Sequence, residues 1–144
     1  MADTTVKTRA NPAAEAWELC MALFGQSRPR MLDIQAEYGL KPPQFFALQA
    51  LDEPVPMSSV ANFLRCDRSA VTWITDRLEE RGYVERRSDA RDRRVKLLAL
   101  TDEGVRVREE IRRRLAVPPD ALVSRLSPAE QRELRDLLRK ALEQ

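Results

Sequence analysis

Basic side chains are concentrated in one segment of the chain, residues 81–96. This segment holds seven basic and three acidic residues, an excess of four positive charges, whereas the whole chain carries a formal charge of +2. Its sequence has the pattern of two short strands, residues 83–88 and 95–100, around an arginine-rich loop. A basic patch on a projecting loop is typical of a phosphate-binding surface, so the segment predicts a DNA-binding wing.

The residue types on which most enzymes depend are missing. The chain has no histidine, which removes the commonest general base, the commonest metal ligand and every nucleophile that pairs with histidine. The two cysteines, Cys20 and Cys66, fit neither a disulfide framework nor a four-ligand zinc site. We therefore expect no enzymatic activity, no cofactor and no metal ion.

Length and composition indicate a single globular domain. The 144 residues are 43% hydrophobic and 33% charged, which suffices for a substantial core. No apolar run is long enough to cross a bilayer, and the first residues lack the apolar core of a signal sequence. We expect a cytoplasmic protein without a membrane partner, in which residues 1–10 form a flexible tail.

Capping signals place helices on both sides of the wing. Asn11 is the predicted N-cap of a first helix that continues to about residue 38, with a kink at residues 25–28. Thr101 is the predicted N-cap of a helix after the wing, and Ser127 starts the last helix with a capping box. These helices frame the segment that contains the wing.

The segment before the wing predicts a helix-turn-helix. A helix beginning at Pro42 is followed by a short one, capped at residues 58–59, that is expected to bury Phe63. After a tight turn, a further helix runs from its N-cap Asp67 to Arg81. Two helices in this arrangement followed by a hairpin form a winged helix-turn-helix, in which the second helix reads bases.

The expected DNA-binding residues lie on that second helix and on the wing. The major groove presents hydrogen-bonding edges and thymine methyls, whereas wing arginines suit the narrow, negative minor groove. The predicted set is Arg68, Ser69, Thr72, Trp73, Arg77, Arg86, Arg91, Asp92, Arg93 and Arg94. Two interpretations of Trp73 stand side by side: packing on the base of the wing, which we favour, or contact with thymine methyls. Arg86 is expected either to reach a phosphate or to anchor the hairpin.

From Asp67 to Gly104 the sequence resembles the MarR family of bacterial transcription regulators. The similarity extends over essentially the whole chain and rests on motifs in the family's order and spacing: Asp76-Arg77-Leu78-Glu79, Gly82-Tyr83-Val84-Glu85-Arg86, Asp92-Arg93-Arg94 and Leu100-Thr101 with Gly104. The resemblance implies a mainly α fold with a small β-hairpin wing. Residues 11–144 would form one domain, with the winged helix at about 42–101 and dimerisation helices at about 11–38 and 102–144.

The same resemblance implies a function and partners. The protein would be an obligate homodimer that binds a pseudopalindromic double-stranded DNA operator as a repressor, and a small molecule or an oxidant would release the DNA. Arg94 would be the minor-groove arginine, and Asp92 the carboxylate that orients it. Thr72 and Trp73 would lie at the major groove.

Effector sensing has two candidate sites. A small aromatic or phenolic effector would bind a pocket lined by Trp17, Met21, Phe24, Phe45 and Phe46, although such a stripe is more often plain core. Residues 19–24 resemble a branch of the family that senses organic peroxides, and this resemblance implies that Cys20 is the sensor. We favour the simpler interpretation of a buried cysteine of low reactivity. Cys66 is expected to be structural. A winged-helix module that binds proteins in place of DNA is the remaining alternative.

Overall fold

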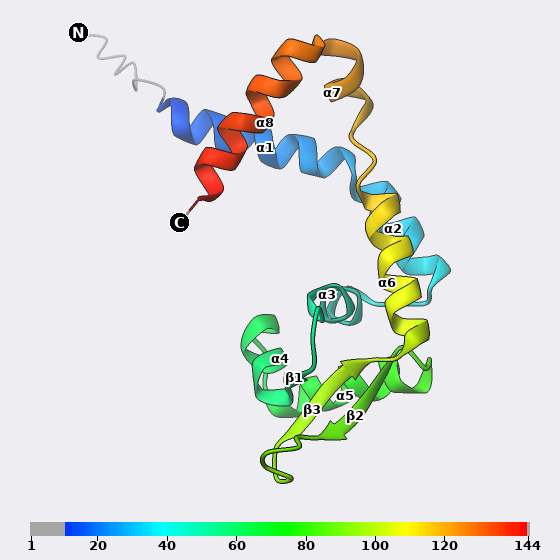
Figure 1. The fold of residues 1–144 in the computed structure, drawn as a ribbon. Helices are drawn as coiled ribbons and strands as arrows, with labels where there is room; N and C mark the ends of the chain where they lie inside the picture. The colour runs from blue at the N-terminus through cyan, green and yellow to red at the C-terminus, as the bar shows by residue number, and fades with distance from the viewer. Residues whose placement is uncertain (1–10, 144) are drawn as a thin grey trace, which may run out of the picture. The chain divides into compact units, whose positions relative to one another are not determined.

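The computed structural model describes residues 11–143, so the predicted tail at residues 1–10 lies outside the described part of the chain. The chain is mainly helical with a small antiparallel sheet, which confirms the predicted fold class (Figure 1). The elements are α1 (Pro12–Gln26), α2 (Arg28–Glu37), α3 (Pro42–Ala50), β1 (Val55–Pro56), α4 (Met57–Leu64), α5 (Arg68–Glu80), β2 (Val84–Ser88), β3 (Lys96–Leu100), α6 (Asp102–Leu115), α7 (Asp120–Arg125) and α8 (Pro128–Leu142).

Helix starts follow the predicted side-chain caps. The side-chain oxygens of Asn11, Asp67, Thr101 and Ser127 accept hydrogen bonds from backbone amides in the first turns of α1, α5, α6 and α8, at 2.8–3.4 Å. Each cap satisfies an amide that has no partner within its own helix. The predicted kink is a break at Ser27, where α1 ends and α2 begins.

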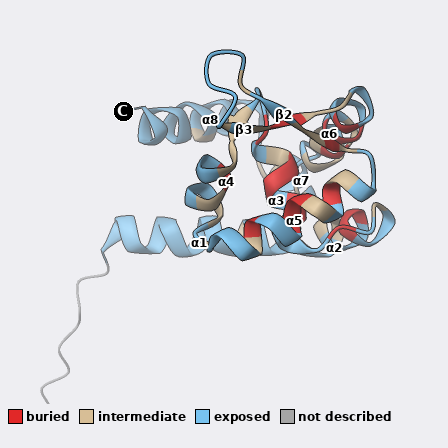
Figure 2. Cartoon of the chain, turned by 90° about the horizontal axis from the view of Figure 1, so that it is seen from below, coloured by how far each residue is buried: buried red, intermediate tan, exposed pale blue. Residues whose placement is uncertain are grey.

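The chain forms two compact units, which are described separately. The winged-helix unit comprises residues 30–117, and the second unit comprises, within the described part of the chain, residues 11–29 and 118–143. Buried apolar residues from several elements form the core of the winged-helix unit, among them Ile34, Phe45, Leu48, Leu78, Leu98 and Ile111. Figure 2 colours the ribbon red where residues are buried. In the second unit, α1, α7 and α8 contain no buried residue.

A three-stranded sheet replaces the expected two-stranded hairpin. The strands lie in the order β1-β3-β2, with Val55 opposite Leu98 and Val84 opposite Leu100. The short strand β1 ties the segment between α3 and α4 to the wing. β3 is therefore the central strand of the sheet, and the wing loop connects it to the edge strand β2.

The helix α4 differs from its prediction in two respects. It begins at Met57, with Pro56 as an N-cap that supplies no side-chain hydrogen bond, so the expected cap at residues 58–59 is wrong. Phe63 is 59% exposed, so its predicted burial is also wrong. Val60 occupies the buried position of this short helix. Phe63 lies three residues further on the same face, but there it lines an open pocket of about 170 Å³ beside Leu51 and Val55, which leaves its ring exposed.

Candidate nucleic-acid interface

The outer face of α5 is polar and accessible. Val71, Ile74, Thr75 and Leu78 are buried in the core, which fixes the orientation of the helix. The predicted contact residues all lie on the exposed side: Arg68, Ser69, Thr72, Trp73 and Arg77. The Thr72 hydroxyl donates a hydrogen bond to the Arg68 carbonyl at 3.0 Å, which leaves its oxygen as an acceptor and its methyl group accessible.

Trp73 has a neighbour that the sequence did not indicate. The Lys41 ammonium, at the N-cap of α3, lies 5.9 Å from the centroid of the Trp73 ring, within the range of a cation–π contact. The indole remains 44% exposed. Lys41 is 32 residues away in the chain, and no local pattern connects the two. Trp73 is thus held at the surface and not in the core.

The wing loop is ordered by its own aspartates. Asp89 accepts a hydrogen bond from the Arg91 amide at 2.7 Å, and Asp92 accepts one from the Arg94 amide at 3.0 Å. Short side chains that bond an amide two residues ahead stabilise turns in this way. Figure 1 shows the loop projecting from the end of the sheet formed by β2 and β3. The arginine side chains therefore extend from a fixed loop.

Asp92 also lies beside the Arg94 side chain. Its carboxylate is 3.7 Å from the Arg94 Nε, while the Arg94 side chain is 95% exposed. At this distance and exposure the pair adds little stability. The contact instead biases the direction of the guanidinium, which leaves its two outer nitrogens available to another acceptor.

The arginines of this face fall into two groups by their partners. Arg77 pairs with Glu80 at 2.8 Å, and Arg87 pairs with Glu85. Arg68, Arg91 and Arg93 form no ion pair within the described part of the chain, and all three are exposed. A guanidinium without a carboxylate is the better phosphate ligand, because it loses no existing pair on binding.

Arg86 belongs to the paired group and connects β2 to α5. Its two terminal nitrogens donate to Glu79 at 2.6 Å, Asp76 at 2.5 Å and the Thr75 hydroxyl at 2.6 Å. Its backbone amide also donates to Glu79 at 3.3 Å. Of the two expected roles for Arg86, this geometry supports the anchor of the hairpin: the side chain sets the position of β2 relative to α5.

Replacing Arg86 with lysine tests this positioning role. Lysine keeps the charge but not the fork of donors, so we expect a loss of about 1 kcal/mol in stability and weaker DNA binding. The salt dependence of DNA binding should not change, because the number of phosphates contacted stays the same. Denaturant unfolding and binding titrations at several salt concentrations measure both, with Arg87→Lys as the control. Wild-type stability in Arg86→Lys would contradict the anchoring role, because lysine cannot form the hydrogen bonds that Arg86 donates to Thr75, Asp76 and Glu79.

Comparison with known proteins places this arrangement in a family. Residues 40–96 match the model of the MarR family. The transcriptional repressor MprA of Escherichia coli K12 is 33% identical over 136 residues, which cover 86% of this chain and 73% of MprA. The chain belongs to the MarR family. It is a transcriptional regulator with the DNA-binding winged-helix fold.

Two further members show the extent of the likeness. The HTH-type transcriptional repressor MdtR of Bacillus subtilis is 39% identical over 85 residues, which cover 58% of this chain. These residues span about half of MdtR, 55% of its length. The structure of a MarR family protein from Bacillus stearothermophilus has a TM-score of 0.72 and 26% identity, and the match covers 92% of this chain and 96% of that one.

The residues of the predicted effector pocket divide between the two units. Trp17, Met21 and Phe24 are exposed on α1, at 66%, 49% and 58%. Phe45 is buried in the winged-helix core, with its ring edge-on to that of the partly exposed Phe46 at 5.6 Å between centroids. None of the five lines the two described cavities, of about 410 and 170 Å³. An effector site at these residues remains a prediction.

Cys20 is exposed, so its predicted burial is wrong. The expectation assumed that the apolar residues of the first helix enclose the thiol. In the structure α1 has no buried residue, so its apolar side chains do not enclose the thiol. Cys66 is half-buried in the turn between α4 and α5.

Within residues 11–143, no helix has the length and apolarity that a membrane span requires.

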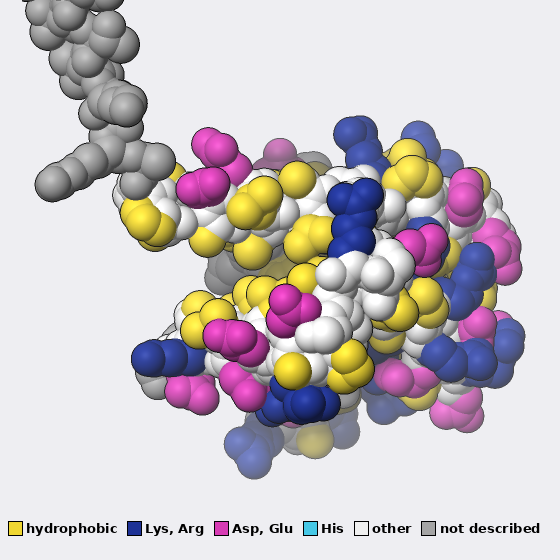
Figure 3. All heavy atoms as spheres, turned by 90° about the horizontal axis from the view of Figure 1, so that it is seen from above, with side chains coloured by type: hydrophobic (Ala, Val, Ile, Leu, Met, Phe, Trp, Pro, Cys, Tyr) yellow, Lys and Arg dark blue, Asp and Glu magenta, His cyan; other side chains and the backbone are white. Residues whose placement is uncertain are grey.

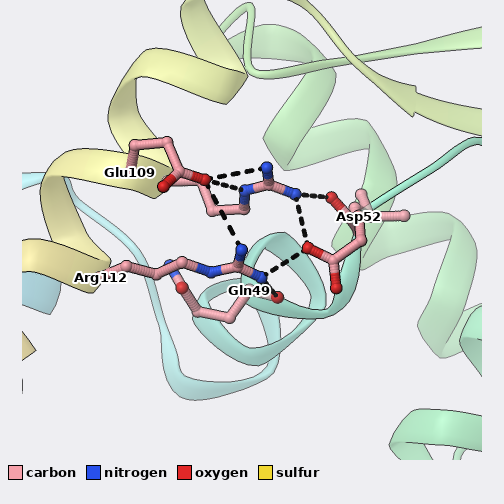
Figure 4. A network of polar contacts seen from close by, with 6 residues as sticks. Gln49, Asp52, Glu109 and Arg112 are labelled. Atoms are coloured by element: carbon pink, nitrogen blue, oxygen red, sulfur yellow. Dashed lines mark hydrogen bonds and ion pairs between the residues drawn. The ribbon is translucent and has the colours of Figure 1, made fainter. Parts of the chain in front are cut away.

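A polar network holds the C-terminal end of α3 against α6 (Figure 4). Arg112 donates to the Gln49 carbonyl at 2.8 Å and to the Asp52 carboxylate at 2.9 Å. Arg108, whose side chain is 10% exposed, donates to the Leu51 carbonyl and to Asp52 at 3.2 Å. Two cations thus lie at the negative end of the α3 dipole and satisfy carbonyls that have no partner within the helix.

This network gives Asp52 a measurable pH dependence. The hydrogen bond from Arg112, together with the charges of Arg112 and Arg108, lowers the pKa of the Asp52 carboxyl below 3.8, against an opposing effect of desolvation. The folded state therefore binds this proton less tightly than the unfolded state. The resulting stability is present above about pH 4 and is lost as the pH falls through the lower, folded-state pKa.

We expect Asp52→Asn to lower stability at pH 6 but to match the wild type progressively as the pH falls below about 4. Urea unfolding between pH 3 and pH 7 measures the difference. Asp33→Asn is the control, because Asp33 is exposed and forms no ion pair within residues 11–143. A difference between Asp52→Asn and wild type that is the same at every pH would contradict this role of the network.

Proposed function

We propose that the protein binds a pseudopalindromic operator in double-stranded DNA as a homodimer and represses transcription from it. The observation that carries the proposal is the wing: Arg91, Arg93 and Arg94 are exposed on a loop that Asp89 and Asp92 hold in place. A fixed cationic loop suits the narrow minor groove, where the potential is most negative.

The proposed contacts of α5 lie in the major groove of the DNA, and those of the wing lie in the minor groove. In a winged helix-turn-helix the recognition helix enters the major groove, where Ser69 and Thr72 would reach base edges. Because Trp73 is 44% exposed and lies beside Lys41, the second interpretation of this residue is preferred here: its indole would offer an apolar edge to a thymine methyl group. Arg68 would contact phosphate, and Arg94 would enter the minor groove with Asp92 orienting it. Arg86 would act indirectly, by holding the wing at the right distance from α5.

The exposed apolar surface of the second unit supports a homodimer. The helices α1, α7 and α8 bury no residue, and Figure 3 shows hydrophobic side chains gathered along this unit. An apolar groove of about 410 Å³ lies between α7 and α8, lined by Leu122, Val123, Leu126, Leu134, Leu138 and Leu142 among others. Exposed apolar areas of this kind are typical of interfaces, and twofold symmetric dimers are the commonest assembly.

Two measurements test the proposal. Sedimentation equilibrium should give twice the chain mass of 16.5 kDa. Anisotropy titration of a labelled duplex pool should show binding whose logarithmic affinity falls linearly with the logarithm of salt concentration. A monomer, or no binding to duplex DNA at low salt, would overturn the proposal. No enzymatic step is proposed, because the relatives MdtR and MprA are named as transcriptional repressors.

A further inference from the structure

Arg65 has a backbone conformation that its side chain disfavours. Its φ of 49° and ψ of 46° lie in the left-handed region, and it is the only residue other than glycine with positive φ among residues 11–143. A side chain in this region meets the following carbonyl oxygen, a clash that glycine avoids. The folded chain is therefore less stable with arginine at this position than it would be with glycine.

The helix-turn-helix requires this backbone conformation. Arg65 ends α4, and its amide donates to the Asn62 carbonyl at 3.3 Å. The next amide, of Cys66, donates to the Ala61 carbonyl at 3.1 Å. This is the helix ending that glycine normally provides, and it turns the chain directly toward the cap of α5 at Asp67. Glycine would therefore satisfy the fold better than arginine does.

The Arg65 side chain contributes no folding contact that explains its retention. It is exposed, and within the described residues its guanidinium makes no hydrogen bond and no ion pair. The neighbouring carboxylate of Asp67 accepts from the Ala70 amide at 2.8 Å. Strained residues of this kind concentrate at functional sites, where the side chain serves something other than stability.

The position of Arg65 near the start of α5 indicates a function for its side chain. It precedes α5 by three residues, and Arg68, in the first turn of α5, is also exposed and without an ion pair in the described part of the chain. Recognition helices enter the major groove with their N-terminal residues foremost, which brings this end close to the phosphates at the edge of the groove. Two unpaired guanidinium groups at that end match a phosphate in charge and in hydrogen-bonding geometry.

We infer that Arg65 is a DNA-backbone contact, which with Arg68 binds phosphate at the N-terminal end of the recognition helix. The contact fixes the register of α5 on the duplex and carries no base preference of its own. The inference rests on the proposed binding of duplex DNA. It adds a residue outside both the recognition helix and the wing, and it explains why a strained arginine stands where glycine would be more stable.

The decisive variant is Arg65→Gly, because the inference predicts opposite effects on two measurements. Thermal unfolding should occur at higher temperature, since glycine relieves the strain. The Kd for duplex DNA should rise about tenfold for operator and random sequences alike. The slope of log Kd against log salt should fall by about 1.8 for a dimer, about 0.9 for each phosphate that the variant no longer neutralises.

Two further variants complete the test. Arg65→Lys keeps the charge, so it should retain most of the salt slope and gain no stability. Arg106→Gln is the matched control, an exposed arginine of the same unit that pairs with Glu103, and it should change neither affinity nor slope. If Arg65→Gly binds with wild-type affinity and slope, or is less stable than wild type, the inference is overturned. Failure of the wild type itself to bind duplex DNA would instead remove the proposed function.

Discussion

Arg94→Ala is expected to weaken DNA binding by about tenfold to a hundredfold, the range for removing a hydrogen-bonded charge interaction. The side chain is 95% exposed and its nearest carboxylate is 3.7 Å away, so nearly all of its interaction capacity is free for DNA. The part of the loss that comes from phosphate contact should be similar for all sequences, because the backbone carries no sequence information. Binding titrations on operator and random duplexes at several salt concentrations measure both affinity and slope.

The same exposure separates this effect from loss of folding. Because Arg94 supports little of the structure, Tm for Arg94→Ala should stay within about 1 °C of wild type. The slope of log Kd against log salt should fall by about 1.8 for a dimer in which both copies of the arginine are removed. The control is Arg106→Ala, which removes an exposed arginine outside the interface. An unchanged salt slope for Arg94→Ala would exclude it from contact with the DNA backbone.

Gly104→Ala should destabilise the winged-helix unit more than any surface change. A Cβ atom at position 104 would lie 1.8 Å from the carbonyl oxygen of Tyr83 and 2.8 Å from its carbonyl carbon. That oxygen also accepts the Thr101 amide at 3.1 Å, so it cannot move without breaking the junction between β2 and α6. We expect a loss of about 3 kcal/mol and a Tm lower by roughly 10 °C, measured by circular dichroism.

Gly25→Ala is the matched control for this substitution. Gly25 also lies in a helix, α1, but a Cβ there would meet no heavy atom within 4 Å. Alanine should then stabilise the helix by up to about 1 kcal/mol, because it restricts the unfolded chain. Equal effects of the two substitutions would show that the approach of α6 to Tyr83 is not tight.

Side-chain caps predicted the starts of α1, α5, α6 and α8, but not the start of α4. A cap acts within three residues of its own position, so Asn11, Asp67, Thr101 and Ser127 could be read directly from the sequence. The strand β1 escaped prediction, since two residues carry no periodic pattern and their partners lie more than 40 positions away. The six-residue helix α7 was likewise too short to show a period.

The position of the wing loop was predictable from the sequence, but the partners of its arginines were not. Charge density placed the wing, yet the sequence could not show that Arg86 is paired with Asp76 and Glu79 while Arg94 is almost free. Those pairs depend on how the strand β2 packs against α5. Arg65 went unnoticed because positive charge was sought on elements and not in the turn between them. The absence of glycine at residues 65–67 was the available signal.

Selection of bound sequences from random duplex DNA by the full-length protein tests the central claim most directly. The account predicts an enriched pseudopalindrome whose half-sites lie about 10–10.5 base pairs apart, or a multiple of that distance, because two recognition helices related by a twofold axis enter successive major grooves. Recovery of no common sequence, or of a single unrepeated half-site, would contradict a dimeric, sequence-specific regulator.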